Sequence, residues 1–147
     1  MKITVICAGK LKERYFAEAV NEYVKRLSRY CTIKIEEVND GPDMLSEAER
    51  MKKRMPEGAC VIACEIAGER YSSEGFSKKI ESLMAGGNGH IVFLIGGSDG
   101  LHESISKMAD FKLSFSDMTF PHMLMRVILL EQIYRAFRIM NNEPYHK

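Results

Sequence analysis

Two kinds of segment alternate along the chain, short apolar runs and longer amphipathic stretches. The short runs predict strands: KITVIC at 2–7, TIKIEEV at 32–38, CVIACEI at 60–66, HIVFLIG at 90–96 and FKLSFS at 111–116. The longer stretches carry apolar residues at helical spacing and predict helices at 13–30, 44–54, 73–85, 101–109 and 122–140. Near-continuous apolar strands between helices are typical of an α/β fold, a mostly parallel sheet with helices on both faces.

The chain has the size of one ordinary domain, so residues 1–147 are expected to form a single unit with a single site. No internal repeat, low-complexity tract or linker interrupts it. The first apolar run is too short for a signal peptide, and no run reaches membrane-spanning length. The expected location is therefore the cytoplasm.

A net charge of +1 argues against a protein that coats nucleic acid non-specifically, because that affinity grows with the number of phosphates neutralised. A local basic patch remains compatible with the composition. The cysteines form no C-x-x-C pair and have no histidine partners at zinc-finger spacing. Cys60 and Cys64 fall on one face of a strand, which favours burial over metal binding or catalysis.

The strongest helical pattern, 122–140, has one arginine among its apolar positions. A narrow polar stripe of this helix carries Glu131, Arg135, Arg138 and Asn142. Arg126 lies on another side, where burial is expected, and a buried guanidinium is costly unless it is paired. Its partner is either an acidic side chain or strand carbonyl groups of the same chain, or else a ligand or a site shared with a second subunit. Apolar residues around most of the helix favour a homodimer built partly on it.

Glycines gather in FLIGGSDGL at 93–101, between a buried strand and a helix. Such a turn lies at the carboxyl edge of a parallel sheet, where glycines let a ligand approach the backbone. The spacing matches neither a dinucleotide fingerprint nor a P-loop, so a tight turn without a ligand is an equal alternative. His90 and His102 flank this loop, and a structural role is expected for both.

Beyond the last helix, Tyr145, His146 and Lys147 follow a proline and form a short tail. Such tails are often frayed and without function. An aromatic ring, an imidazole and a cation are also the groups that grip an exposed base and its phosphate.

Three segments carry a resemblance to a known family: FLIGGSDGLH, LSFSDMTFPHMLMRVILLEQIYRAFRIM and the terminal PYHK. The chain closely resembles the ribosomal RNA large subunit methyltransferase H family of the SPOUT superfamily, over its entire length. The resemblance implies a homodimer with a deep trefoil knot in the C-terminal half, although true knots are rare. It also implies S-adenosylmethionine bound in that knot, and methylation of N3 of a pseudouridine in helix 69 of 23S rRNA in assembled ribosomes.

By the same resemblance, three segments form the cofactor pocket. The strand at 60–66 contributes Cys64 as a wall for the adenine, and the glycine loop contributes Gly96, Gly97 and Gly100. The third segment contributes mainly backbone groups, from Ser116, Asp117, Met118, Thr119, Phe120 and Pro121. Pro121 is expected at the first position of the last helix, where its missing N–H is not needed.

Methylation of a uracil-type N3 requires removal of a proton and stabilisation of negative charge on the ring. Arg126 is the expected group to orient the base and stabilise its anion, and His122 is either the proton acceptor or a structural cap. Arg135, Tyr145, His146 and Lys147 are the expected RNA contacts, with the tail crossing towards the other protomer's cofactor. No metal is expected.

Two other functions compete with this one. A non-catalytic ribosome-associated factor would keep the knotted pocket but only bind. A phosphate- or nucleotide-binding protein would rest on the glycine loop alone, and the missing P-loop lysine weakens it. The ligand that the pocket prefers separates these functions.

Overall fold

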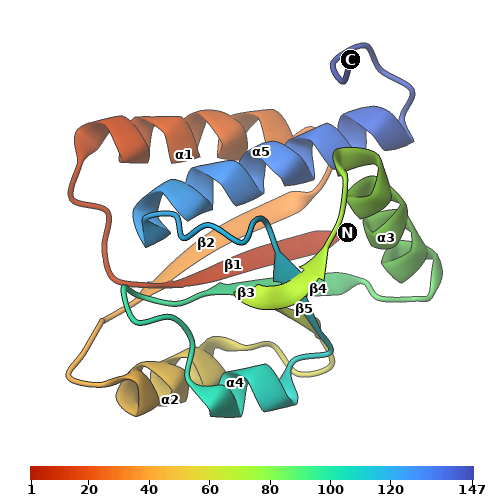
Figure 1. Ribbon diagram of the computed structural model, residues 1–147. Coiled ribbons are helices and arrows are strands. Elements are labelled where there is room, and N and C mark those ends of the chain that lie inside the picture. The colour runs from red at the N-terminus through yellow and green to blue at the C-terminus, as the bar shows by residue number, and fades with distance from the viewer.

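A computed structural model describes residues 1–147, in which strands and helices alternate strictly (Figure 1). The elements are β1 (Lys2–Ala8), α1 (Arg14–Leu27), β2 (Thr32–Val38), α2 (Met44–Arg54), β3 (Cys60–Arg70), α3 (Ser73–Ala85), β4 (His90–Ile95), α4 (Glu103–Met108), β5 (Phe111–Ser114) and α5 (His122–Met140). Every predicted strand and helix is present, which confirms the alternation. The boundaries differ most at β3, which runs to Arg70 rather than ending at 66.

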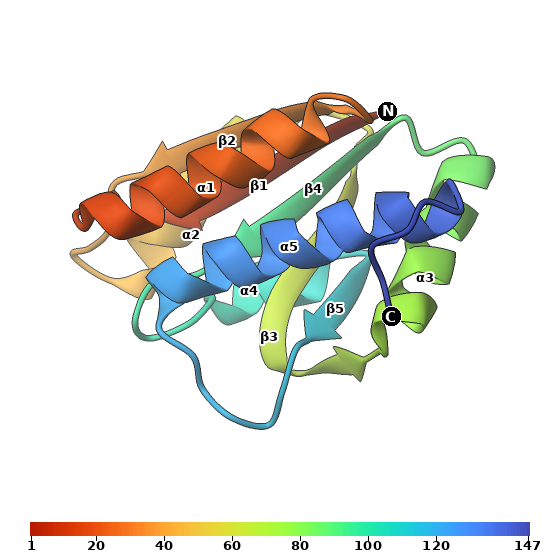
Figure 2. The same ribbon diagram turned by 90° about the horizontal axis from the view of Figure 1, so that it is seen from above.

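The strands form one sheet in the order β2-β1-β4-β3-β5, and all its neighbouring pairs are parallel. Helices cover both faces, as predicted (Figure 2). α1, α3 and α5 enclose the larger hydrophobic cluster, which includes Leu27, Phe76, Phe93 and Leu130. α2 and α4 enclose a smaller cluster on the opposite face, around Met51 and Ile105. The α/β prediction is therefore confirmed.

The sheet splits at β3, because this strand pairs with β4 only over Cys60–Ala63. Its pairing with β5 is interrupted by an irregularity between Cys64 and Glu69. Gly68 allows the close crossing, since a Cβ there would lie 2.7 Å from the backbone of Lys112. The split separates the carboxyl ends of β3 and β4 and leaves room between them.

Cys60 and Cys64 pack on the same face of the sheet, as the pattern predicted. Cys7, Cys31 and Cys60 are buried, while Cys64 is half-buried and packs against the same cluster as Cys60. No helix of the structure combines the length and apolar character needed to cross a bilayer.

Candidate active site

A cavity lies at the carboxyl edge of the sheet, in the space opened by the split. Its volume is about 790 Å³, a size suited to a small organic ligand. Three chain segments line most of it: Cys64–Ala67 after the part of β3 that pairs with β4, the glycine loop after β4, and the segment between β5 and α5. These are the three segments that the family resemblance implied for the cofactor.

Most of the predicted cofactor residues line this cavity together. They are Cys64, Gly96, Gly97, Gly100, Ser116, Met118, Thr119, Phe120 and Pro121. Burial raises the pKa of the Cys64 thiol far above its usual range, so the thiol stays protonated and serves as a wall. Pro121 lies at the N-cap of α5, one residue earlier than expected.

Asp117 is the exception among the predicted cofactor residues, because its side chain points elsewhere. Its carboxylate pairs with Arg70 at 2.6 Å, and both side chains are exposed. The pair ties the segment before α5 to the end of β3. An exposed pair of this kind adds little to stability.

The glycine loop closes tightly on itself. Gly97 and Gly100 form an isolated bridge, and Gly100 has a φ of 84°, a conformation that favours glycine. A Cβ on Gly96 would lie only 2.4 Å from the carbonyl of Gly100. Gly97 has more space, because its nearest neighbours would be 3.5 Å away, on the Glu47 carboxylate.

We expect Gly96→Ala to damage the cavity more than any other single methyl group added to this loop. The backbone must shift to relieve the overlap, which costs about 1–3 kcal/mol of stability and displaces the lining residues. The displaced lining residues should weaken the binding free energy of the cavity's ligand by about 1.4 kcal/mol. This corresponds to an about ten-fold loss of affinity. Thermal denaturation and calorimetric titration measure the two effects.

The matched control is Gly97→Ala, which adds the same methyl group where the contacts are ordinary. Its melting temperature should stay close to that of the parent chain. Equal destabilisation by the two substitutions would show that the tight closure at Gly96 is not what shapes the loop.

The histidines occupy different environments. His122 begins α5 and lines the cavity. Both predicted roles, proton acceptor and structural cap, are compatible with this position. His102 is the N-cap of α4, and its Nδ1 accepts from Ser104 N at 3.1 Å. His90 lies at the other edge of the sheet, 2.8 Å from Thr4 Oγ1. The structural roles expected of His90 and His102 fit these contacts.

Arg126 is buried, as its position among apolar residues predicted, with 1% of its surface exposed. Its Nη1 donates to Glu37 Oε2 at 2.5 Å, and its Nη2 donates to Gly9 O at 2.6 Å and to Ala8 O at 3.2 Å. It does not line the cavity. Of the two interpretations of this arginine, the structure shows the internal salt bridge with strand carbonyl groups, and the guanidinium has no surface with which to contact a base.

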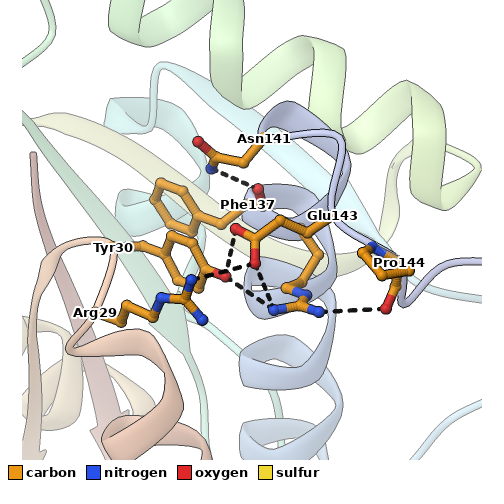
Figure 3. Close-up of polar contacts among 7 residues, drawn as sticks. Arg29, Tyr30, Phe137, Asn141, Glu143 and Pro144 are labelled. Atoms are coloured by element: carbon orange, nitrogen blue, oxygen red, sulfur yellow. Dashed lines mark hydrogen bonds and ion pairs between the residues drawn. The ribbon is translucent and has the colours of Figure 1, made fainter.

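Glu143 fixes the chain as it leaves α5 (Figure 3). It accepts hydrogen bonds from Tyr30 Oη at 2.8 Å and Arg138 Nη1 at 2.6 Å, and Arg29 Nη2 lies 3.5 Å away. The Tyr30 ring stacks on Phe137 of the helix, with centroids 5.5 Å apart. The end of the helix is therefore anchored to the loop after α1, and the tail starts from a fixed point.

The tail folds back onto its own helix. The Tyr145 hydroxyl donates to Glu131 Oε1 at 2.6 Å, which raises the pKa of Tyr145 to about 12, and Arg135 lies 4.6 Å from the centroid of the tyrosine ring. His146 Nε2 contacts Glu74 of α3 at 2.7 Å, and Nδ1 lies 3.1 Å from Arg135 Nη1. Three of the four predicted RNA contacts thus form one cluster, next to Lys147.

In both views the C-terminus lies beyond the end of α5 that is opposite its start (Figures 1 and 2). The cluster contacts the helix at Glu131 and Arg135, whereas the helix residues that line the cavity are His122 and Met125 at its start. The rise of a helix puts Arg135 about 20 Å from His122 along the axis. The structure therefore does not bring the predicted RNA contacts to the cavity of the same chain.

The cavity also contains residues that the sequence analysis did not single out. They include Glu65, Ile66, Asp99, Leu101, Phe115 and Met125. Glu65 follows the buried part of a strand. An acidic side chain at this position of a parallel sheet was the feature of the sequence that could have indicated a binding residue. The cavity lining contains two carboxylates and no lysine or arginine.

Comparison with known proteins agrees with this geometry. Residues 1–146 match the family described as "Predicted SPOUT methyltransferase". The chain is 54% identical to "Ribosomal RNA large subunit methyltransferase H" of Ruminiclostridium cellulolyticum and 50% identical to the protein of that name from Acetivibrio thermocellus. Both comparisons cover 100% of each chain.

Solved structures share the fold at low sequence identity. A probable methylase family protein from Haemophilus influenzae superposes with a TM-score of 0.57 at 13% identity, over 99% of this chain and 70% of the other. The SpoU methyltransferase AviRb from Streptomyces viridochromogenes, in complex with AdoMet, superposes with a TM-score of 0.51 at 10% identity, over 95% of this chain and 58% of the other. These likenesses support the α/β architecture.

Proposed function

The chain belongs to the SPOUT methyltransferase family, and from that premise we propose that it methylates N3 of a pseudouridine in helix 69 of 23S rRNA. S-Adenosylmethionine is the proposed methyl donor, and the assembled ribosome is the proposed substrate, which makes the cytoplasm the site of action. Full-length identity of 54% to a protein named as an rRNA large subunit methyltransferase supports the class of substrate.

The observation that carries the proposal is the chemistry of the cavity. The lining offers apolar groups such as Leu113, Phe115 and Met125, suited to an adenine ring and a thioether chain. The lining contains two carboxylates, Glu65 and Asp99, and no lysine or arginine. A cationic ligand fits these carboxylates, whereas a phosphate would be repelled. The phosphate-binding alternative is therefore disfavoured.

S-Adenosylmethionine bound in the cavity would supply an electrophilic methyl group on a sulfonium sulfur. The chain's own contribution is to hold the base in line with that methyl group and to remove the N3 proton. His122 is the proposed proton acceptor, because it is the one imidazole in the cavity lining. Arg126 is the proposed positioning residue, which fixes the first turn of α5 and thereby His122 and Met125.

The proposed assembly is a homodimer that packs through α5. Leu124 and Ile128 lie one turn apart on this helix, and both are only half-buried within one chain. Apolar side chains in such a row are well suited to contact with a second copy. A second copy would also bring its tail to the cavity, which the tail of the same chain does not reach. The trefoil knot expected of the family is part of this proposal.

Transfer of tritiated methyl groups to ribosomes that lack the modification tests the proposed reaction. We expect label in 23S rRNA, and mapping of the labelled nucleotide should identify the helix 69 pseudouridine. Label at another nucleotide would contradict the proposed substrate. A folded chain that binds S-adenosylmethionine and ribosomes without transferring label would instead be the non-catalytic binding factor.

A further inference from the structure

Glu65 lies where β3 separates from β4 and is half-buried in the wall of the cavity. Alternation along the strand directs its side chain to the opposite face from Cys64, towards α4. There the hydroxyl of Ser106 donates a hydrogen bond to Glu65 Oε1. One carboxylate oxygen is thus held by the protein, which fixes the orientation of the group, and the structure gives Oε2 no hydrogen bond within the chain.

The charge of Glu65 is not balanced by the protein. No lysine or arginine lines the cavity, and Glu65 forms no ion pair. The other lining carboxylate, Asp99, is exposed in the glycine loop and is free to be solvated. In a partly buried cavity an unbalanced negative charge favours a positive ligand more strongly than it would in water.

We propose that Glu65 is the residue that makes the cavity prefer S-adenosylmethionine over S-adenosylhomocysteine. The two molecules share the adenosine and the amino acid, and differ in the methyl group and the positive charge on sulfur. Contacts with the shared parts bind both equally, so a preference has to come from the methyl group or from the charge, and of these two only the charge attracts a carboxylate. This inference rests on the proposed cofactor and adds the group that selects its charged form.

The preference has a consequence for turnover. When the methyl group leaves, the electron pair of the sulfur–carbon bond stays on sulfur, and the methyl group forms a bond to N3. The N3 proton passes to a base, and the ligand in the cavity loses its sulfonium charge. The attraction to Glu65 is then lost, so the product dissociates more readily than the donor.

Calorimetric titration of both ligands into Glu65→Gln tests the proposal. The amide has nearly the same shape and keeps an oxygen that accepts from Ser106, so the fold should be retained. We expect the affinity for S-adenosylmethionine to fall by about ten-fold, the size expected for one charge pair at an intermediate effective dielectric constant. The affinity for S-adenosylhomocysteine should change by less than about two-fold, because it carries no sulfonium charge.

Two further variants test whether the charge of Glu65 and its position are both required. Glu65→Asp keeps the charge and should retain part of the preference that Glu65→Gln loses. Glu103→Gln removes an equal charge from α4, outside the cavity, where Glu103 pairs with Lys107, and should leave both affinities unchanged. A melting curve for each variant confirms that it is folded.

The outcomes distinguish failure of the selection by Glu65 from failure of the proposed cofactor. Equal weakening of both ligands by Glu65→Gln would mean that Glu65 binds a shared group, and would overturn the selection. Unchanged affinities would overturn it as well. If the parent chain binds neither ligand, the proposed cofactor itself is wrong and the selection falls with it.

Discussion

Removal of residues 144–147 is expected to abolish methyl transfer to ribosomes while leaving the affinity for S-adenosylmethionine unchanged. The truncation ends after Glu143, so the contacts of Glu143 with Tyr30 and Arg138 remain and α5 keeps its anchor. What is lost is Tyr145, His146 and Lys147, three of the four side chains proposed to hold the RNA. Because misplacement of a substrate alone can cost about 100-fold in rate, transfer should fall by at least that factor.

The tail's own contacts suit a segment that can leave its helix. The bond between His146 and Glu74 involves an exposed carboxylate, and such contacts contribute little to stability. Methyl-transfer assays and calorimetric titration of the truncated chain separate the two functions. Loss of cofactor binding would show that the tail supports the cavity rather than the RNA, and unchanged transfer would rule out its role.

Mixed dimers decide whether the tail serves its own cavity or the partner's. A full-length Gly96→Ala chain has a damaged cavity and an intact tail, and the truncated chain has the reverse. Co-expression with different tags gives mixed dimers in which one intact cavity meets one intact tail only across the subunit boundary. Random assembly should restore about a quarter of the parent activity, since half the dimers would carry one working site of two. A tail that acts within its own chain would restore none.

The positions of the strands and helices were predictable because burial leaves a local periodic pattern in the sequence. The order of the strands was not, since every strand of a parallel sheet has a similar apolar pattern. The split at β3 depends on the irregular pairing between Cys64 and Glu69 and on the close crossing at Gly68. A single glycine in a strand did not reveal that geometry.

The candidate site was also predictable only in part from the sequence. The glycine loop was found from its own pattern, and Cys64 and residues 116–121 were assigned through the family resemblance. Glu65 was missed because an acidic residue after a strand is usually an ordinary surface group. The burial of Arg126 was predicted from its place on the helix. Its partners were not, because Glu37 and Gly9 lie 89 and 117 positions away in the sequence. The periodic pattern indicates that a residue is buried. Which residues it contacts depends on the tertiary fold.

Replacement of Arg126 by methionine is expected to destabilise the chain by about 3 kcal/mol, as is typical when one partner of a buried ion pair is removed. The substitution removes the guanidinium from Glu37 and from the carbonyl groups of Ala8 and Gly9. Glu37 keeps the hydrogen bond from Leu11 N at 2.9 Å and, being 34% exposed, recovers some hydration. For a domain of this size the melting temperature should fall by about 6–12 °C.

Cofactor affinity should fall with stability in Arg126→Met, because a loosened first turn of α5 moves His122 and Met125 in the cavity wall. A residue that touches only the base would give a different result, with lower transfer but unchanged melting and cofactor binding. That result would restore Arg126 as a catalytic contact and would require the guanidinium to leave Glu37 when RNA binds.

The double variant Arg126→Met with Glu37→Gln provides the final test of the ion pair. If the pair accounts for the loss, the double variant should be less destabilised than the sum of the two single variants, because no unpaired carboxylate remains near the helix. Strict additivity would mean that the hydrogen bonds to Ala8 and Gly9, rather than the charge of Glu37, hold the start of α5. Arg126→Lys distinguishes charge from geometry here, since an ammonium group keeps the charge but does not reproduce the planar fork that spans Glu37 and both carbonyl groups.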